Sequence, residues 1–239
     1  MLLEIRNVNT FYGTSHVLQG ISINVSPGEI VALLGRNGMG KSTTLKTIMG
    51  FVKPKSGSVI FKGKNITGLP PYKVAQAGIG YVPEDRRIFA KLTVFDNLMM
   101  GVKGGKIKNL EDPKTWTIER IYYHFPLLKK TADRKGNCLS GGEQQMLTIG
   151  RSLMGNPEIL LVDEPTEGLS PFMVNEVRDI LAEINKTGVS ILLVEHNLKV
   201  ALSLAHRVYL MGKAFVGFSG SVEELTANPQ ARSKYLEAA

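Results

Sequence analysis

The stretch that decides the fold is Ile30 to Ser42, which reads IVALLGRNGMGKS. It begins with the apolar run Ile30 to Leu34 and continues as G-x-x-x-x-G-K-[ST], the pattern of a phosphate-binding loop. Apolar side chains then recur at helical spacing, at Leu45, Ile48 and Met49. A strand, a glycine-rich loop and a helix in this order predict a loop whose backbone amides surround phosphate groups at the positive end of a helix.

The chemistry of this loop predicts a nucleotide site. In such loops the lysine, here Lys41, reaches the β and γ phosphates, and the hydroxyl of Ser42 can hold Mg²⁺. The residues expected to bind the nucleotide are Gly35, Asn37, Gly38, Gly40, Lys41, Ser42 and Thr43. A glycine-rich turn without a ligand is the alternative, and the strand and helix that flank the motif argue against it.

Two further apolar runs, Ile159 to Val162 and Ile191 to Val194, are also strand-sized and precede helix-like patterns. Strands that are apolar on both faces belong in a parallel sheet covered by helices. One covering helix is expected between Pro171 and Gly188. The predicted fold class is therefore α/β, with a mainly parallel sheet as its core.

The N-terminal part alternates apolar and polar residues, as an antiparallel β layer would. From Leu92 to Met154 the pattern is helical, without a convincing strand, which predicts an inserted α-helical subdomain. We expect one domain over residues 1–239, in which 1–91 and 155–239 form the core with its β layer and 92–154 form the helical subdomain. Within the helical subdomain, the sequence VKGGKIKNLEDPK, Val102 to Lys114, is expected to be an exposed connection.

Composition favours a soluble cytoplasmic protein. Hydrophobic residues make up 43% and charged residues 21% of the chain, and no apolar run approaches the roughly 18 residues that span a bilayer. The N-terminus lacks the order of segments that a signal peptide requires. The single cysteine, Cys138, excludes an internal disulfide and is expected to be a small buried side chain. The formal charge of +8 is compatible with nucleotide, nucleic acid or an acidic membrane surface.

Two acidic residues, Asp163 and Glu164, follow the run Ile159 to Val162 directly. The carboxyl end of a buried parallel strand is where open α/β sheets place their ligand crevice. Asp163 suits Mg²⁺ and Glu164 suits activation of the attacking water. Two acids that only cap the next helix are the alternative, which the phosphate loop in the same chain disfavours.

The third element is LSGGEQQ, from Leu139 to Gln145. Ser140 and Glu143 fit an S-x-x-E capping box, so a helix is expected to begin here. Its N-terminus would offer glycine amides and a hydroxyl to an anion. An ordinary capped helix would have the same pattern. The phosphate loop upstream and the acidic strand end downstream favour an anion-binding role for this segment instead.

The order of these elements, a phosphate loop, LSGGEQQ, ILLVDEP and a strand-end histidine, resembles the ATPases of ABC transporters over essentially the whole chain. The resemblance implies ATP and Mg²⁺ as cofactors. It also implies that Tyr12 stacks on adenine and that His196 contacts the γ-phosphate. Ser140, Gly141 and Gly142 would bind the γ-phosphate of ATP held by a second ABC ATPase, identical or homologous, in a head-to-tail dimer.

Two positions depart from the family pattern. Glu84, in YVPEDRRIF, stands where the family usually has glutamine, so a carboxylate is expected beside the γ-phosphate, as a ligand of Mg²⁺ or to orient water. Ser170 stands where the family usually has an aspartate, so that residue's cross-subunit contacts cannot be carried over.

The segments RRIF, LTVFDNL and PTEGLSP and the tail ANPQARSKYLEAA are similar to the LivF-type ATPase subunits of branched-chain amino acid importers. This similarity implies integral membrane permease subunits as partners, an extracytoplasmic substrate-binding protein as an indirect partner, and a place on the cytoplasmic face of the membrane. An importer of urea or short amides is one alternative. An ABC ATPase that acts on nucleic acid is another, disfavoured because such proteins have coiled-coil insertions, zinc-binding cysteines or tandem cassettes, so no nucleic-acid partner is expected.

Overall fold

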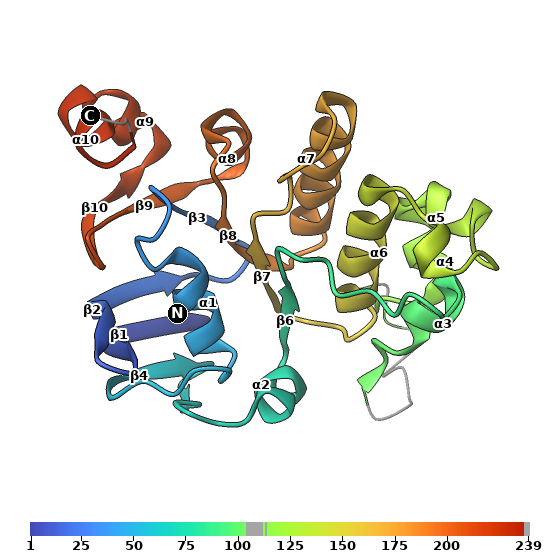
Figure 1. Ribbon diagram of the computed structural model, residues 1–239, viewed down its shortest axis with the longest axis horizontal. Coiled ribbons are helices and arrows are strands. Elements are labelled where there is room, and N and C mark those ends of the chain that lie inside the picture. Colours follow the sequence, from blue (N-terminus) through green and yellow to red (C-terminus); the bar gives the residue numbers. More distant parts are fainter. Residues whose placement is uncertain (104–111, 113, 237–239) are drawn as a thin grey trace.

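The computed structural model describes residues 1–103, 112 and 114–236 (Figure 1). Its core is a six-stranded sheet in the order β10-β9-β3-β8-β7-β6, in which β10 is antiparallel to β9 and the other five strands are parallel. The strands are β3 (Ile30–Gly35), β6 (Ile79–Val82), β7 (Ile159–Asp163), β8 (Ser190–Val194), β9 (Arg207–Gly212) and β10 (Phe215–Ser221). Every residue of β3, β7 and β8 is buried, as expected of strands covered on both faces.

A second sheet is antiparallel and has the order β2-β1-β4-β5. Its strands are β1 (Leu3–Tyr12), β2 (Ser15–Val25), β4 (Ser56–Phe61) and β5 (Lys64–Asn65). The helix α1 (Lys41–Ile48) shares one hydrophobic core with this sheet and with one face of the parallel sheet. In that core Leu45 and Ile48 of α1 pack with Leu161 of β7 and Ile21 of β2.

The opposite face of the parallel sheet is covered by helices, above all α6 (Gly141–Leu153) and α7 (Pro171–Lys186). Figure 1 shows α3 to α6 gathered on the far side of the molecule from the antiparallel sheet. Further helices in the described part of the chain are α2 (Pro71–Ala77), α3 (Val94–Met99), α4 (Ile118–His124), α5 (Pro126–Lys130), the 3-10 turn η2 (Gly136–Cys138), α8 (Leu198–Leu204), α9 (Val222–Thr226) and α10 (Pro229–Leu236). The predicted fold class is confirmed: a parallel α/β core, an antiparallel β layer and an inserted group of helices.

The register of the parallel sheet brings three strand ends to one edge. Val194 at the end of β8 pairs with Leu33 of β3 on one side and with Asp163 of β7 on the other. The loops that leave β3, β7 and β8 therefore begin side by side. Gly35 and Asp163 are the last residues of β3 and β7, and Glu164 and His196 lie in the loops that follow β7 and β8.

Two expectations concern the helical part. Cys138, expected to be buried, is exposed, because the short turn η2 that contains it lies on the surface before α6. Most of the predicted connection from Val102 to Lys114 lies outside the described residues. The described residues of 92–154 form α3 to α6 and η2, with a single isolated bridge between Thr93 and Lys135 in place of a strand. The boundaries of the predicted division, 1–91, 92–154 and 155–239, stay predictions.

Candidate nucleotide site

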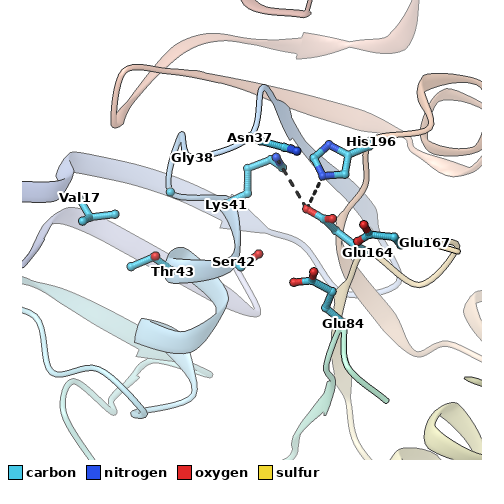
Figure 2. Close-up of a pocket in the computed structure, with 11 residues that line it drawn as sticks. Val17, Asn37, Gly38, Lys41, Ser42, Thr43, Glu84, Glu164, Glu167 and His196 are labelled. Carbon is cyan, nitrogen blue, oxygen red and sulfur yellow. Dashed lines mark ion pairs between the residues drawn. The ribbon is translucent and has the colours of Figure 1, made fainter. Parts of the chain in front are cut away.

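The glycine-rich loop joins β3 to α1 and forms one wall of a pocket of about 330 Å³ (Figure 2). Gly38 and Gly40 both have left-handed backbones, with φ of 77° and 97°. At Gly40 an added Cβ would lie 2.7 Å from Leu18 Cδ2, so a side chain at this position would collide with β2. Of the predicted nucleotide-binding residues, those that line the pocket are Asn37, Gly38, Gly40, Lys41, Ser42 and Thr43.

Lys41 holds the loop in shape with its ammonium group. Its Nζ donates hydrogen bonds to the carbonyl oxygens of Gly35 at 2.9 Å and Arg36 at 3.2 Å, and lies 3.8 Å from Glu164 Oε1. Only 4% of the side chain is exposed. Burial lowers the pKa of Lys41, and the negative charge of Glu164 opposes the shift. Lys41 is thus a buried cation between the loop and the end of β7.

Ser42 and Asp163 meet beneath the loop. Ser42 Oγ donates to Asp163 Oδ1 at 2.8 Å, and the hydroxyl of Tyr81 on β6 donates to Asp163 Oδ2 at 3.1 Å. Burial raises the pKa of Asp163, and the hydrogen bonds from Ser42 and Tyr81 oppose this rise. A hydroxyl and a carboxylate in contact are oxygen ligands of the kind that Mg²⁺ takes, so these residues fit the predicted metal. Tyr81 had not been predicted, because its strand is short and contains Gly80.

Glu164 is held in an unusual backbone conformation at the end of β7. Its φ is 47°, which is uncommon outside glycine, and its N–H donates to Val194 O at 2.9 Å. Its Oε1 lies 2.7 Å from Nε2 of His196, as Figure 2 shows. The structure therefore brings together the predicted pair, Glu164 and His196, with Lys41 on the same carboxylate oxygen.

The electrostatics of this pair follow from its surroundings. Burial raises the pKa of Glu164 to about 7, with Lys41 opposing and a hydrogen bond with Glu167 reinforcing the shift. Burial also lowers the pKa of His196, and the Lys41 charge adds to this effect. A carboxylate whose pKa lies near neutrality is suited to accept a proton at physiological pH.

Two more acidic residues, Glu84 and Glu167, lie beside Glu164. Glu84 and Glu167 both line the pocket, and carboxylate oxygens of Glu84, Glu164 and Glu167 lie within 4.8 Å of one another. Burial raises the pKa of Glu84, and the charges of Glu167 and Asp163 raise it further. Glu167 was not among the predicted site residues. Its spacing of three from Glu164, in a turn closed by a hydrogen bond from Glu167 N to Glu164 O, could have indicated it.

Like Asp163 beneath the loop, Gly35 and Tyr12 lie outside the pocket lining. Gly35 is buried at the end of β3, where its carbonyl accepts the hydrogen bond from Lys41. Tyr12 lies at the end of β1 with 47% of its surface exposed, while Val17, from the strand that follows, lines the pocket. The proposed stacking of Tyr12 on adenine stays a prediction.

The LSGGEQQ segment is also separate from this pocket. Ser140 caps α6, accepting from Glu143 N at 3.3 Å, while Glu143 Oε2 accepts from Ser140 N at 2.7 Å, so the predicted capping box is present. Ser140 is exposed, and an added Cβ at Gly141 or Gly142 would crowd Arg86 or Met173. These residues do not line the pocket of their own chain.

Comparison with known proteins decides the family. A model described as ABC transporter matches residues 18–167. The chain is 39% identical over 235 residues to BraG of Pseudomonas aeruginosa, a high-affinity branched-chain amino acid transport ATP-binding protein, covering 98% of this chain and 99% of BraG. The chain belongs to the ABC transporter family.

Other ABC proteins are similar over the same length. LptB of Haemophilus influenzae, a lipopolysaccharide export system ATP-binding protein, is 32% identical, with 98% of this chain and 97% of LptB covered. The ADP conformation of MJ1267, an ATP-binding cassette of an ABC transporter, has a TM-score of 0.82 at 28% identity, with 96% of each chain covered. A dimeric post-hydrolysis state of the cassette MJ0796, bound to ADP and Pi, has a TM-score of 0.80 at 25% identity, covering 92% of this chain and 99% of that one.

The chain is therefore an ABC ATPase, which binds ATP and couples its hydrolysis to transport. Among the described residues of this ABC ATPase, no helix has the length and apolar character needed to cross a membrane.

The raised pKa of Glu164 predicts a specific pH dependence of stability. Because the folded protein binds this proton more tightly than the unfolded chain, for which the usual pKa is 4.5, the free energy of unfolding should fall as pH rises from about 4.5 to about 7. Glu164→Gln has no such charge, so its stability relative to wild type should grow over this interval and stay constant above it. Urea denaturation without nucleotide at pH 5 and pH 8 measures the difference.

Glu29→Gln is the matched control. Although burial opposes the shift, hydrogen bonds from Arg207 and Ser26 lower the pKa of Glu29, so its carboxylate is ionised at both pH values. Its stability difference from wild type should not change between them. If Glu164→Gln behaved like this control, the carboxylate of Glu164 would not have a raised pKa.

Proposed function

We propose that this ABC ATPase powers the import of branched-chain amino acids. The observation that carries the proposal is the 39% identity to BraG across nearly the full length of both chains, higher than the 32% identity to LptB. The segments RRIF and PTEGLSP, similar to the ATPases of such importers, support the same assignment.

In the proposed reaction the phosphates, the metal and the attacking water are each held by different residues. The loop amides and Lys41 hold the phosphates of ATP, as the buried ammonium at the start of α1 supports. Ser42 and Asp163 would hold Mg²⁺, which neutralises charge on the phosphates when bound. Glu164 accepts a proton from the attacking water, because its pKa of about 7 matches the working pH.

His196 and Glu84 act beside this base. His196, 2.7 Å from the carboxylate of Glu164, fixes that carboxylate and offers its imidazole to the γ-phosphate. Glu84 reaches the same space from the loop after β6 and orients water or the metal. Its negative charge adds to the rise in the pKa of Glu164.

A second cassette would complete the site. Ser140, Gly141 and Gly142 lie outside the pocket of their own chain, at an exposed helix N-terminus suited to a phosphate. In a head-to-tail pair, this terminus would close on ATP held by the partner. The dimeric state of MJ0796 supports such a pair.

The partners follow from the proposed transport. The pair would bind integral membrane permease subunits as a peripheral complex on the cytoplasmic face, with an extracytoplasmic substrate-binding protein acting indirectly. A second candidate function is lipopolysaccharide export, favoured by the similarity to LptB over 98% of this chain. Import of urea or short amides is a third. We propose no nucleic-acid partner.

The role of Glu84 predicts how Mg²⁺ dependence responds to substitution. Glu84→Gln keeps a hydrogen-bonding group, so the hydrolysis rate should stay within about tenfold of wild type. Glu84→Ala should lose more, about 1–3 kcal/mol of transition-state stabilisation, as expected for a lost hydrogen bond to a charged group. Mg²⁺ titrations of ATP hydrolysis provide the measurement, and identical curves for wild type and Glu84→Ala would place the residue outside the mechanism.

Transport itself tests the proposed substrate. In host cells whose only copy carries Lys41→Ala, uptake of radiolabelled leucine, isoleucine and valine should fall to the level of cells without the gene. Lys62→Ala, which removes a surface lysine paired with Glu158, is the matched control and should leave uptake unchanged. Unchanged uptake in the Lys41→Ala cells, with lipopolysaccharide retained at the inner membrane, would favour the export alternative instead.

A further inference from the structure

Glu195 is a buried carboxylate that has no task in the reaction described above. It lies between the end of β8 and His196, and 2% of its surface is exposed. Its Oε1 accepts hydrogen bonds from the N–H and from the hydroxyl of Thr166, and its Oε2 accepts from Asn197 N–H at 2.7 Å. One carboxylate therefore joins the loop after β7 to the loop after β8.

The two loops carry the catalytic pair. Thr166 lies two residues after Glu164, and Asn197 lies directly after His196. A backbone hydrogen bond from Glu164 N to Val194 O, of 2.9 Å, joins the loops at their base. Glu195 provides the second connection, further along both loops. The two loops that bring Glu164 and His196 within 2.7 Å of each other are thus joined by two sets of hydrogen bonds.

The chemistry of this link requires an ionised acid. All three groups around Glu195 donate hydrogen bonds, and a carboxylate is a side chain that only accepts. A glutamine of the same shape would turn an NH₂ group toward an N–H donor. Because a buried donor without an acceptor is costly, this substitution would let one loop move away from the other.

We propose that Glu195 is a positioning residue for ATP hydrolysis, which fixes the loop after β7 to the loop after β8 so that Glu164 and His196 stay in contact. The proposal rests on the roles proposed for Glu164 and His196. It assigns Thr166 as the partner through which Glu195 acts on the loop that carries Glu164 and Glu167.

Steady-state kinetics of Glu195→Gln test the proposal. We expect kcat to fall at least about tenfold, as for one lost charge-assisted hydrogen bond, while KM for ATP stays within about twofold because Lys41 and the phosphate loop are untouched. Glu29→Gln, which alters a half-buried carboxylate bonded to Ser26 and Arg207, controls for a general loss of stability and should leave kcat unchanged.

Thr166 supplies a second variant in case Glu195→Gln does not fold. Thr166→Val keeps the shape of the side chain and removes only the hydroxyl, so kcat should fall in the same direction by a smaller factor. Thr166→Ser restores the hydroxyl and should restore kcat. With kcat expressed per folded molecule, a merely structural role of Glu195 would leave kcat unchanged in these variants.

Single-turnover hydrolysis in the Glu164→Gln background completes the test. If Glu195 acts through Glu164, adding Glu195→Gln, or Thr166→Val if that variant does not fold, should not slow the residual reaction further, since residues that act as a unit are not additive. Wild-type kcat in both Glu195→Gln and Thr166→Val, or an equal factor in both backgrounds, would overturn the proposal while leaving the role of Glu164 intact. Wild-type hydrolysis by Glu164→Gln alone would overturn the proposed catalytic role and this inference together.

Discussion

The alignment of the carboxyl ends of β3, β7 and β8 is the constraint on which the site depends. Val194 pairs with Leu33 and Asp163, so the phosphate loop, the acidic strand end and the strand-end histidine leave the sheet at one edge. Strands that are buried on both faces cannot shift by one residue without turning every side chain to the opposite core. The hydrophobic packing of these strands therefore fixes the positions of Lys41, Glu164 and His196, although none of the three contributes to that packing.

The same arrangement concentrates charge where burial makes it costly. Asp163 and Glu164 are almost fully buried, and their neighbours include Glu84 and Glu167 as well as Lys41. Lys41 offsets part of the cost, and hydrogen bonds from Ser42 and Tyr81 stabilise Asp163. The part of this cost that is not offset raises the pKa of Glu164. The anion of Glu164 is therefore less stable, and the carboxylate is a more effective base near pH 7. Stability is thus reduced at the position where proton transfer is proposed.

Sequence alone predicted the elements whose signals are local. The motif around Lys41, the buried run ending at Asp163 and the capping box at Ser140 each depend on residues a few positions apart. It did not predict Glu195, whose partner Thr166 lies 29 residues earlier, since that contact exists only after β7 and β8 pair. Strand β6, with four residues and a central glycine, has little periodicity, so Tyr81 was missed with it. Exposure of Cys138 depends on how η2 lies on the surface, which no local pattern determines.

We propose that these strand ends place Glu164 to promote hydrolysis of ATP, which the phosphate loop binds independently of Glu164. Nucleotide binding and single-turnover hydrolysis by Glu164→Gln, measured on one sample with ATP labelled at the γ-phosphate, test this role. We expect ATP to bind with an affinity near that of wild type, because Lys41 and the loop amides are unchanged. Hydrolysis should be at least about a hundredfold slower, as for loss of a positioned general base. Hydrolysis at the wild-type rate would contradict a catalytic role of Glu164.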